Sequence, residues 1–147
     1  MKILVCGLPG SGKSTLSDAL AELVGAVWIN ADEVREHYDD WDFTPEGRER
    51  QAQRMRYLSD GAILAKRIVI ADFVAPTAAL RKQYDPDYII WMDTINEGRY
   101  ADTNAMFEKV ENADYICKTW NTTVNIIEII EHIKSSFSTT EGYFANE

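Results

Sequence analysis

The chain has 147 residues, of which 46% are hydrophobic and 27% charged, and its formal net charge is −9. This length and balance are typical of one globular domain with its own core. The acidity argues against general binding of duplex nucleic acid, and no apolar run approaches the ~20 residues of a membrane-spanning helix. We expect a cytoplasmic protein without a membrane partner, with a domain over residues 1–137 and a polar tail over 138–147.

The first predicted elements enclose a glycine-rich loop. Residues 3–6 form a short apolar run typical of a strand, and apolar residues then recur at 16, 19, 20 and 23 with helical spacing. Between them lies Gly7-Leu8-Pro9-Gly10-Ser11-Gly12-Lys13-Ser14-Thr15, which fits the P-loop pattern G-x-x-x-x-G-K-S/T without a mismatch. A strand before and a helix after are the context that this motif requires.

This loop is the predicted site of ATP. Its glycines let the backbone approach phosphate oxygens closely, and the N–H groups at the start of the next helix point at negative charge. Lys13 would reach the β- and γ-phosphates, the Ser14 hydroxyl would bind Mg²⁺, and Thr15 would support the turn. The predicted cofactors are therefore ATP and Mg²⁺, and the predicted nucleotide-binding residues are Gly7, Pro9, Gly10, Ser11, Gly12, Lys13, Ser14 and Thr15.

The rest of the chain alternates between strands and helices. Later strands are predicted at residues 26–30, 68–71, 88–92 and 115–117, with helices starting near residues 31, 45, 76 and 122 and weak helical character over 101–107. Short, continuously apolar strands that alternate with helices predict an α/β protein. With the P-loop, this pattern predicts a three-layer P-loop NTPase or kinase fold, in which a five-stranded, mainly parallel sheet carries helices on both faces.

Two helices have a predicted core face. The longest begins with Thr44 as N-cap and Pro45 in its first turn, which suits the start of a helix. Its core face is predicted to hold Met55, Leu58, Ala62 and Ala65, and that of the last helix Ile126, Ile130, Ile133 and Phe137.

Two acids follow predicted strands. In parallel sheets ligands bind beyond the carboxyl ends of the strands, so Asp32 and Asp72 should lie near the P-loop. Asp32 could accept a proton from a hydroxyl or hold a water on Mg²⁺, although an acid at a helix start also suits the helix dipole. Asp72 has the position of a Walker-B acid, although acids at strand ends are common. The predicted metal ligands are Ser14, Asp32 and Asp72.

Arginines gather at the start of the longest helix. Residues 46–67 hold six Lys and Arg against three acids, a local charge of 6 − 3 = +3. Most of them are expected on a solvated face, with pairs such as Glu46–Arg50. Arg48 and Gln51 are three residues apart and could meet an anionic acceptor. Phe43 and Phe73 could stack on a base, although a core role is the usual explanation.

Four stretches, taken together and in order, resemble the adenylylsulfate (APS) kinase family of P-loop kinases. They are the P-loop, Ala31–Arg35 (similar to G-D-N-V-R), Asp42–Gln51 (similar to G-F-S/T-x-x-x-R-x-E-N) and Ile70–Pro76 (similar to V-S/T-x-F-I-S-P). The resemblance implies ATP-dependent phosphorylation of the 3′-hydroxyl of APS, which gives PAPS and ADP. APS or an analogue would then be the small-molecule nucleotide acceptor.

The resemblance also implies residue roles. Asp32 would lie near the acceptor hydroxyl, Arg35 and Arg48 would contact the phosphosulfate, and Phe43 and Phe73 would stack around the adenine. With Gln51, these are the predicted acceptor-binding residues. The predicted catalytic residues are Lys13, Asp32 and Arg99, of which Arg99 would be a lid cation that stabilises charge during transfer. An exposed loop arginine is the plainer explanation of Arg99.

The sequence also departs from the family pattern. Gln51 stands where the family has asparagine, Ala75 where it has serine and Asp72 where it has a small residue, and the lysine-rich lid is reduced to residues 97–100 and Lys109. Three alternatives therefore stay open: a kinase for another hydroxyl (a nucleotide, a modified DNA base or a small alcohol), a nucleotide-binding module without transfer, and a bare ATPase. A homodimer is also left open.

Overall fold

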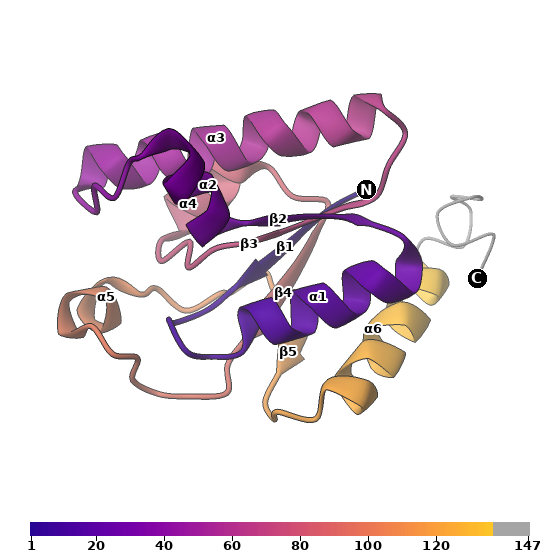
Figure 1. Ribbon diagram of the computed structural model, residues 1–147. Coiled ribbons are helices and arrows are strands. Elements are labelled where there is room, and N and C mark those ends of the chain that lie inside the picture. The colour runs from indigo at the N-terminus through magenta and orange to yellow at the C-terminus, as the bar shows by residue number, and fades with distance from the viewer. Residues whose placement is uncertain (137–147) are drawn as a thin grey trace.

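The computed structural model describes residues 1–136, in which a five-stranded sheet lies between two layers of helices (Figure 1). The predicted three-layer α/β fold is confirmed. Phe137 and the predicted tail lie outside the described residues. The elements in chain order are β1 (Lys2–Cys6), α1 (Lys13–Val24), β2 (Val27–Asn30), α2 (Ala31–Tyr38), α3 (Pro45–Leu64), β3 (Val69–Asp72), α4 (Ala78–Tyr84), β4 (Tyr88–Met92), α5 (Ala101–Met106), β5 (Tyr115–Cys117) and α6 (Thr122–Ser136).

The sheet has the order β2-β3-β1-β4-β5, and every pairing in it is parallel. It is thus more regular than the mainly parallel sheet that the sequence predicts. Central β1 pairs with β3 through Ile3 and Ile70 and with β4 through Ile3 and Tyr88. Because all the strands run the same way, the loops after β1, β2 and β3 meet at one edge. No helix among the described residues is long and apolar enough to cross a membrane.

Each face of the sheet has its own core. Residues of β1 point alternately to the two faces, as in any strand. Ile3 and Val5 pack with Leu16 and Leu20 of α1, together with residues of α6. On the other face, Leu4 and Cys6 pack with residues of α3 and α4, the helices that cover this side in Figure 1. Burial of both faces explains why the strands are apolar without alternation.

The predicted start of α3 is confirmed, and its predicted core face is corrected. Thr44 is the N-cap, and its hydroxyl accepts a hydrogen bond from the Gly47 N–H at 3.2 Å. Met55 is fully buried, whereas Leu58 and Ala62 are only partly buried and Ala65 is exposed at the end of the helix. The reason is that α3 packs on the sheet through its first four turns, so that Leu64 is 86% exposed.

The core face of α6 also differs from the prediction by one position. Ile126 and Ile133 are buried as predicted, but Ile129 fills the position between them, and Ile130 is only partly buried. Spacings of three and four residues both return to one helix face, so the sequence pattern alone did not separate Ile129 from Ile130.

Candidate active site

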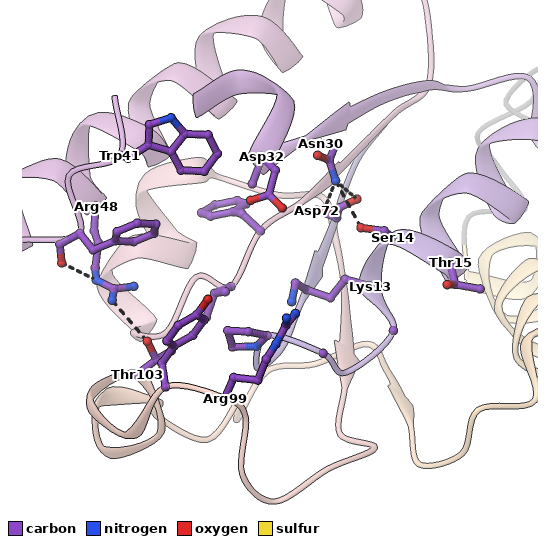
Figure 2. A pocket seen from close by; sticks show the side chains of 18 of the residues that line it. Lys13, Ser14, Thr15, Asn30, Asp32, Trp41, Arg48, Asp72, Arg99 and Thr103 are labelled. Atoms are coloured by element: carbon purple, nitrogen blue, oxygen red, sulfur yellow. Dashed lines mark hydrogen bonds between the residues drawn. The ribbon is translucent and has the colours of Figure 1, made fainter. Parts of the chain in front are cut away.

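The carboxyl edge of the sheet opens into a cavity of about 820 Å³, a volume in the range of small-molecule sites. The P-loop, α2, the loop before α3 and the end of β3 contribute to its walls, as do residues 99–103 and Trp120. Of the predicted site residues, these line it: Pro9, Gly10, Gly12, Lys13, Ser14, Thr15, Asp32, Phe43, Arg48, Asp72, Phe73 and Arg99. Figure 2 shows most of them from close by.

The P-loop needs its glycines for two reasons. Gly10 and Gly12 have φ angles of +85° and +100°, which lie in the left-handed region. A Cβ at Gly12 would also lie 2.8 Å from the ring of Trp120, and one at Gly7 would lie 2.7 Å from the Met92 carbonyl oxygen. Since the N-cap of α1 is Gly12, no side chain occupies the first N–H groups of that helix. They can therefore bind an anion.

Two cations approach the same part of the cavity. The Lys13 ammonium donates to the Leu8 carbonyl at 3.0 Å, and burial lowers the Lys13 pKa while the charge of Asp72 opposes that shift. The Arg99 side chain points toward Lys13 from the segment between β4 and α5 (Figure 2). Thr94 anchors that segment, because its hydroxyl donates to the Ser11 carbonyl at 2.7 Å.

Asp72 lies at the end of β3 and is only 2% exposed. Its carboxylate accepts hydrogen bonds from the Trp28 indole N–H at 2.5 Å and the Asn30 amide at 3.1 Å. Burial raises the pKa of Asp72, and these two hydrogen bonds oppose the rise. The Asn30 amide also donates to the Ser14 hydroxyl at 3.3 Å, which brings three polar groups together.

These oxygen donors fit Mg²⁺. Among residues 1–136, no cluster of three or more His, Cys, Asp or Glu could hold a metal ion. A protein cage is not needed for Mg²⁺, since this ion commonly takes one or two side-chain ligands and completes its shell with phosphate oxygens and water. Ser14, Asp72 and Asp32 supply such oxygens around one wall of the cavity.

Asp32 lies in the first turn of α2, and its carboxylate faces the cavity (Figure 2). Asn30 caps this helix, because its side-chain oxygen accepts a hydrogen bond from the Glu33 N–H at 3.1 Å. The N-terminus of α2 is therefore capped by a residue other than Asp32. In the part of the chain that the structure describes, no hydrogen bond or ion pair engages the Asp32 carboxylate. It is therefore free to accept a proton from a ligand.

The far end of the cavity combines aromatic rings with one buried cation. Trp41 and Phe43 are each about half exposed, whereas Phe73 is buried. Arg48 is 9% exposed, and its guanidinium donates to the Phe43 carbonyl at 2.9 Å and to the Thr103 hydroxyl at 3.5 Å. This end can bind a flat group beside an anion.

An ion-pair cluster supports the loop that carries Trp41 and Phe43. The Asp40 carboxylate pairs with Arg50 at 3.0 Å and Arg54 at 2.6 Å, and Arg50 also pairs with Asp42 at 2.8 Å. The hydrogen bonds from Arg50 and Arg54 hold the pKa of Asp40 well below its usual range. The sequence led us to expect an ion pair between Arg50 and Glu46, but Arg50 instead pairs with the acids of this loop.

Four predicted site residues lie outside the cavity lining. Arg35 donates to the Asp40 and Asp42 carbonyls at 2.9 and 3.1 Å, and its guanidinium lies 4.2 Å from the Phe43 ring centre. The Gln51 amide donates to the Ala31 carbonyl at 3.0 Å. Gly7 and Ser11 belong to the P-loop but do not face the cavity.

Sequence reasoning missed several residues of the site. Trp28 and Asn30 were assigned only to a strand, although polar groups at strand ends do signal proximity to the ligand. Trp41 and Thr103 line the cavity from segments that carried no motif, and Tyr100 lines it from the predicted lid, in which only Arg99 was given a role. Gly47 was also missed: a Cβ there would lie 2.2 Å from the Asp42 carbonyl oxygen, so it permits the close approach of the loop to α3.

Comparisons with known proteins agree with this geometry. Residues 3–100 match the model of a family described as AAA domain (AAA_18). The adenylate kinase of Pyrococcus furiosus is 35% identical over 88 residues, a stretch that covers 59% of this chain and 37% of that relative. The chain therefore spans little more than a third of the length of this curated relative.

Solved structures share the fold. The Mycobacterium tuberculosis APS kinase, in complex with AMPPNP and APS, aligns with a TM-score of 0.72 and 18% identity over 90% of this chain and 96% of that one. The shikimate kinase of Aquifex aeolicus aligns with a TM-score of 0.64 and 15% identity over 97% and 100% of the two chains. Similarity at this level establishes a common P-loop kinase fold.

Proposed function

The chain belongs to the AAA domain family. From this membership and the cavity, we propose that it is an ATP-dependent kinase that phosphorylates a hydroxyl group. The first candidate acceptor is APS. One observation carries the proposal: the unengaged Asp32 carboxylate shares a cavity with the P-loop lysine and with Arg48. A nucleotide-binding module without transfer would use Asp32 only near Mg²⁺, whereas a kinase would also use this carboxylate on the acceptor hydroxyl.

Each residue of the site has a separate role in the proposed phosphoryl transfer. The acceptor oxygen attacks the γ-phosphorus and loses its proton to Asp32, while the bond from the γ-phosphorus to the bridging oxygen breaks and ADP leaves. Lys13 and Arg99 stabilise the charge on the transferred group and on the β-phosphate. When bound, Mg²⁺ would neutralise charge between the two phosphates, held by Ser14 with Asp32 and Asp72 nearby. Positioning and electrostatics supply most of the rate.

The acceptor end supports APS in part. Phe43 and Phe73 occupy positions suited to a base, and Arg48 offers a buried cation to an anionic group. Arg35, which the family resemblance assigns to the phosphosulfate, instead holds the loop backbone. A single arginine at this end favours a second candidate, in which the same chemistry acts on a different hydroxyl, of another nucleotide or of a small alcohol.

A polynucleotide acceptor is disfavoured. Affinity for nucleic acid requires cations that are free to meet phosphates. Of the arginines at the start of α3, Arg50 and Arg54 are paired with Asp40 and Asp42, and Arg48 is buried. The positive charge of Arg50 and Arg54 therefore stabilises the loop before α3, and little of it is available to bind phosphates on the outer surface.

The test is ADP production with Mg·ATP, with and without APS, by the wild type and by Lys13→Ala. We expect APS-dependent ADP from the wild type and a loss of about 10³-fold in the variant, because one preorganised charge is removed from the transferred phosphate. Lys82→Ala, which changes an exposed lysine of α4 away from the cavity, is the matched control and should retain activity.

Other outcomes separate the alternatives. ADP that forms at the same rate without any acceptor would indicate a bare ATPase. Binding of an ATP analogue without ADP from APS, nucleosides, nucleotides or small alcohols would indicate a binding module and would overturn the proposed transfer. Turnover with another acceptor but not with APS would support the second candidate.

A further inference from the structure

We propose that Asn30, together with Trp28, is a positioning residue for the metal–triphosphate site, because it holds the Ser14 hydroxyl, the Asp72 carboxylate and the start of α2 in one arrangement. The inference rests on the proposed function, in which Ser14 and Asp72 serve the metal ion and Asp32 the acceptor. It concerns β2, a strand to which the sequence assigned no role in the site.

The Asn30 side chain contacts three elements of the site, and Figure 2 shows two of these contacts, with Ser14 and Asp72. Its amide nitrogen lies 3.3 Å from the Ser14 hydroxyl and 3.1 and 3.4 Å from the two Asp72 carboxylate oxygens. Its oxygen accepts the Glu33 N–H at 3.1 Å and so caps α2. One small side chain thereby links α1, β3 and α2.

The orientation of this amide is fixed by its partners. The Glu33 N–H can only donate, so the Asn30 oxygen must face it and the NH₂ group must face Ser14 and Asp72. With two hydrogens, the NH₂ can serve the hydroxyl and one carboxylate oxygen at the same time. An aspartate in this place would cap the helix equally well but could not donate to either group.

Trp28 completes the support from the same strand. Its indole N–H donates to Asp72 Oδ2 at 2.5 Å, while Asn30 donates to Oδ1. Each carboxylate oxygen therefore has a donor from β2, and rotation of the carboxylate would break both hydrogen bonds. Groups that orient metal ligands in this way commonly change metal affinity or activity by 10–100-fold when they are replaced.

The arrangement also connects the two ends of the reaction. Asp32 lies two residues beyond Asn30, in the helix that Asn30 caps. A displacement of Asn30 would therefore move the acceptor carboxylate relative to the ligands for the triphosphate. This gives β2 a function in addition to packing, in which Trp28 and Ile29 meet the cores on opposite faces of the sheet.

The test measures binding of Mn²⁺, used in place of Mg²⁺, to the full chain with AMPPNP by loss of the free Mn²⁺ paramagnetic resonance signal. Asn30→Ser keeps an N-cap residue but is too short to reach Asp72, and Trp28→Phe removes the N–H while it keeps the ring. We expect each variant to weaken the apparent Mn²⁺ affinity about 10-fold. A matched control is Thr77→Ala, which removes the N-cap of α4 outside the cavity.

Three outcomes decide the inference. Weaker Mn²⁺ affinity in both β2 variants, with wild-type affinity in Thr77→Ala, supports it. Unchanged Mn²⁺ affinity in both β2 variants overturns it, as does an equal loss in the control, which would indicate general destabilisation. The readout needs no acceptor, so a protein that binds Mn·AMPPNP but phosphorylates nothing would refute the proposed transfer and leave this inference standing.

Discussion

The two ends of the cavity are built in different ways. The end proposed for the nucleotide, here the nucleotide end, comes from one continuous stretch, residues 7–15, in which backbone N–H groups and glycine conformations shape the loop. The end proposed for the acceptor, here the acceptor end, is assembled from α2, the loop before α3, α3 itself and α5, and its side chains are held by ion pairs and hydrogen bonds.

Because of this difference, the two ends are sensitive to different kinds of mutation. A backbone site tolerates changes in distant side chains but not an added Cβ in its own loop. A side-chain site depends on contacts between segments that are far apart in the sequence, such as the pairs of Asp40 with Arg50 and Arg54. Mutations can therefore separate the two ends.

The largest separation is expected from Gly47→Ala. A Cβ at Gly47 would lie 2.2 Å from the Asp42 carbonyl oxygen, so the loop with Trp41 and Phe43 must move away from α3. Overpacking of this kind costs about 1–3 kcal/mol of folding stability. Because the displaced loop no longer positions the acceptor, we also expect kcat/KM for the acceptor to fall roughly 10-fold. The KM for ATP should stay near the wild-type value, as initial-rate kinetics would measure.

Gly61→Ala is the matched control for that prediction. It makes the same substitution in the same helix, where a Cβ would meet nothing within 4 Å. We expect it to stabilise the protein by about 1 kcal/mol without a kinetic effect, because alanine is the better helix former. If Gly47→Ala lowered kcat/KM equally for ATP and for the acceptor, the two ends of the cavity would not be independent.

A smaller effect is expected from Ala75→Gly. The P-loop places glycine at its positive φ angles, whereas Ala75, beyond the end of β3, has a φ of 44°. Relief of this left-handed strain opposes the extra chain entropy of glycine and the loss of a methyl group from a residue that is only 1% exposed, so urea unfolding should show a stability within about 0.5 kcal/mol of the wild type. Ala79→Gly, at an exposed position in the first turn of α4, should instead destabilise it by about 1 kcal/mol. An equal loss of stability in the two variants would contradict the strain at Ala75.

The smallest effect concerns pH. Arg50 and Arg54 hold the pKa of Asp40 below its ordinary value of 3.8 in the folded protein. The ionised Asp40 carboxylate therefore stabilises the folded protein above about pH 4. This stabilisation is lost as the pH falls below the ordinary Asp pKa toward the lower pKa that Asp40 has in the folded protein. Asp40→Asn should be less stable than the wild type at pH 6, and the difference should shrink at pH 3 in urea unfolding. An equal difference in stability between Asp40→Asn and the wild type at pH 6 and pH 3 would contradict the role of the ionised Asp40 carboxylate in holding the loop.

Sequence reasoning succeeded where local signals are strong. The P-loop, the Thr44 cap and the alternating strands are contiguous patterns with direct physical meaning, and all appear in the structure. It was less accurate where helical spacing leaves a choice, as between Ile129 and Ile130 or at Ala65. It could not find Gly47 or Thr103, because their roles arise from contacts with residues on other segments.

The fold class and the P-loop could be predicted from the sequence alone, because a strand, a glycine loop and a helix that follow one another need only local geometry to form. The acceptor end depends on tertiary contacts. There it placed Arg48 in the cavity and Arg35 against the loop, and it joined Asn30 and Trp28 to Asp72. These contacts could not be predicted locally, because they join side chains from segments that only the parallel sheet brings to one edge.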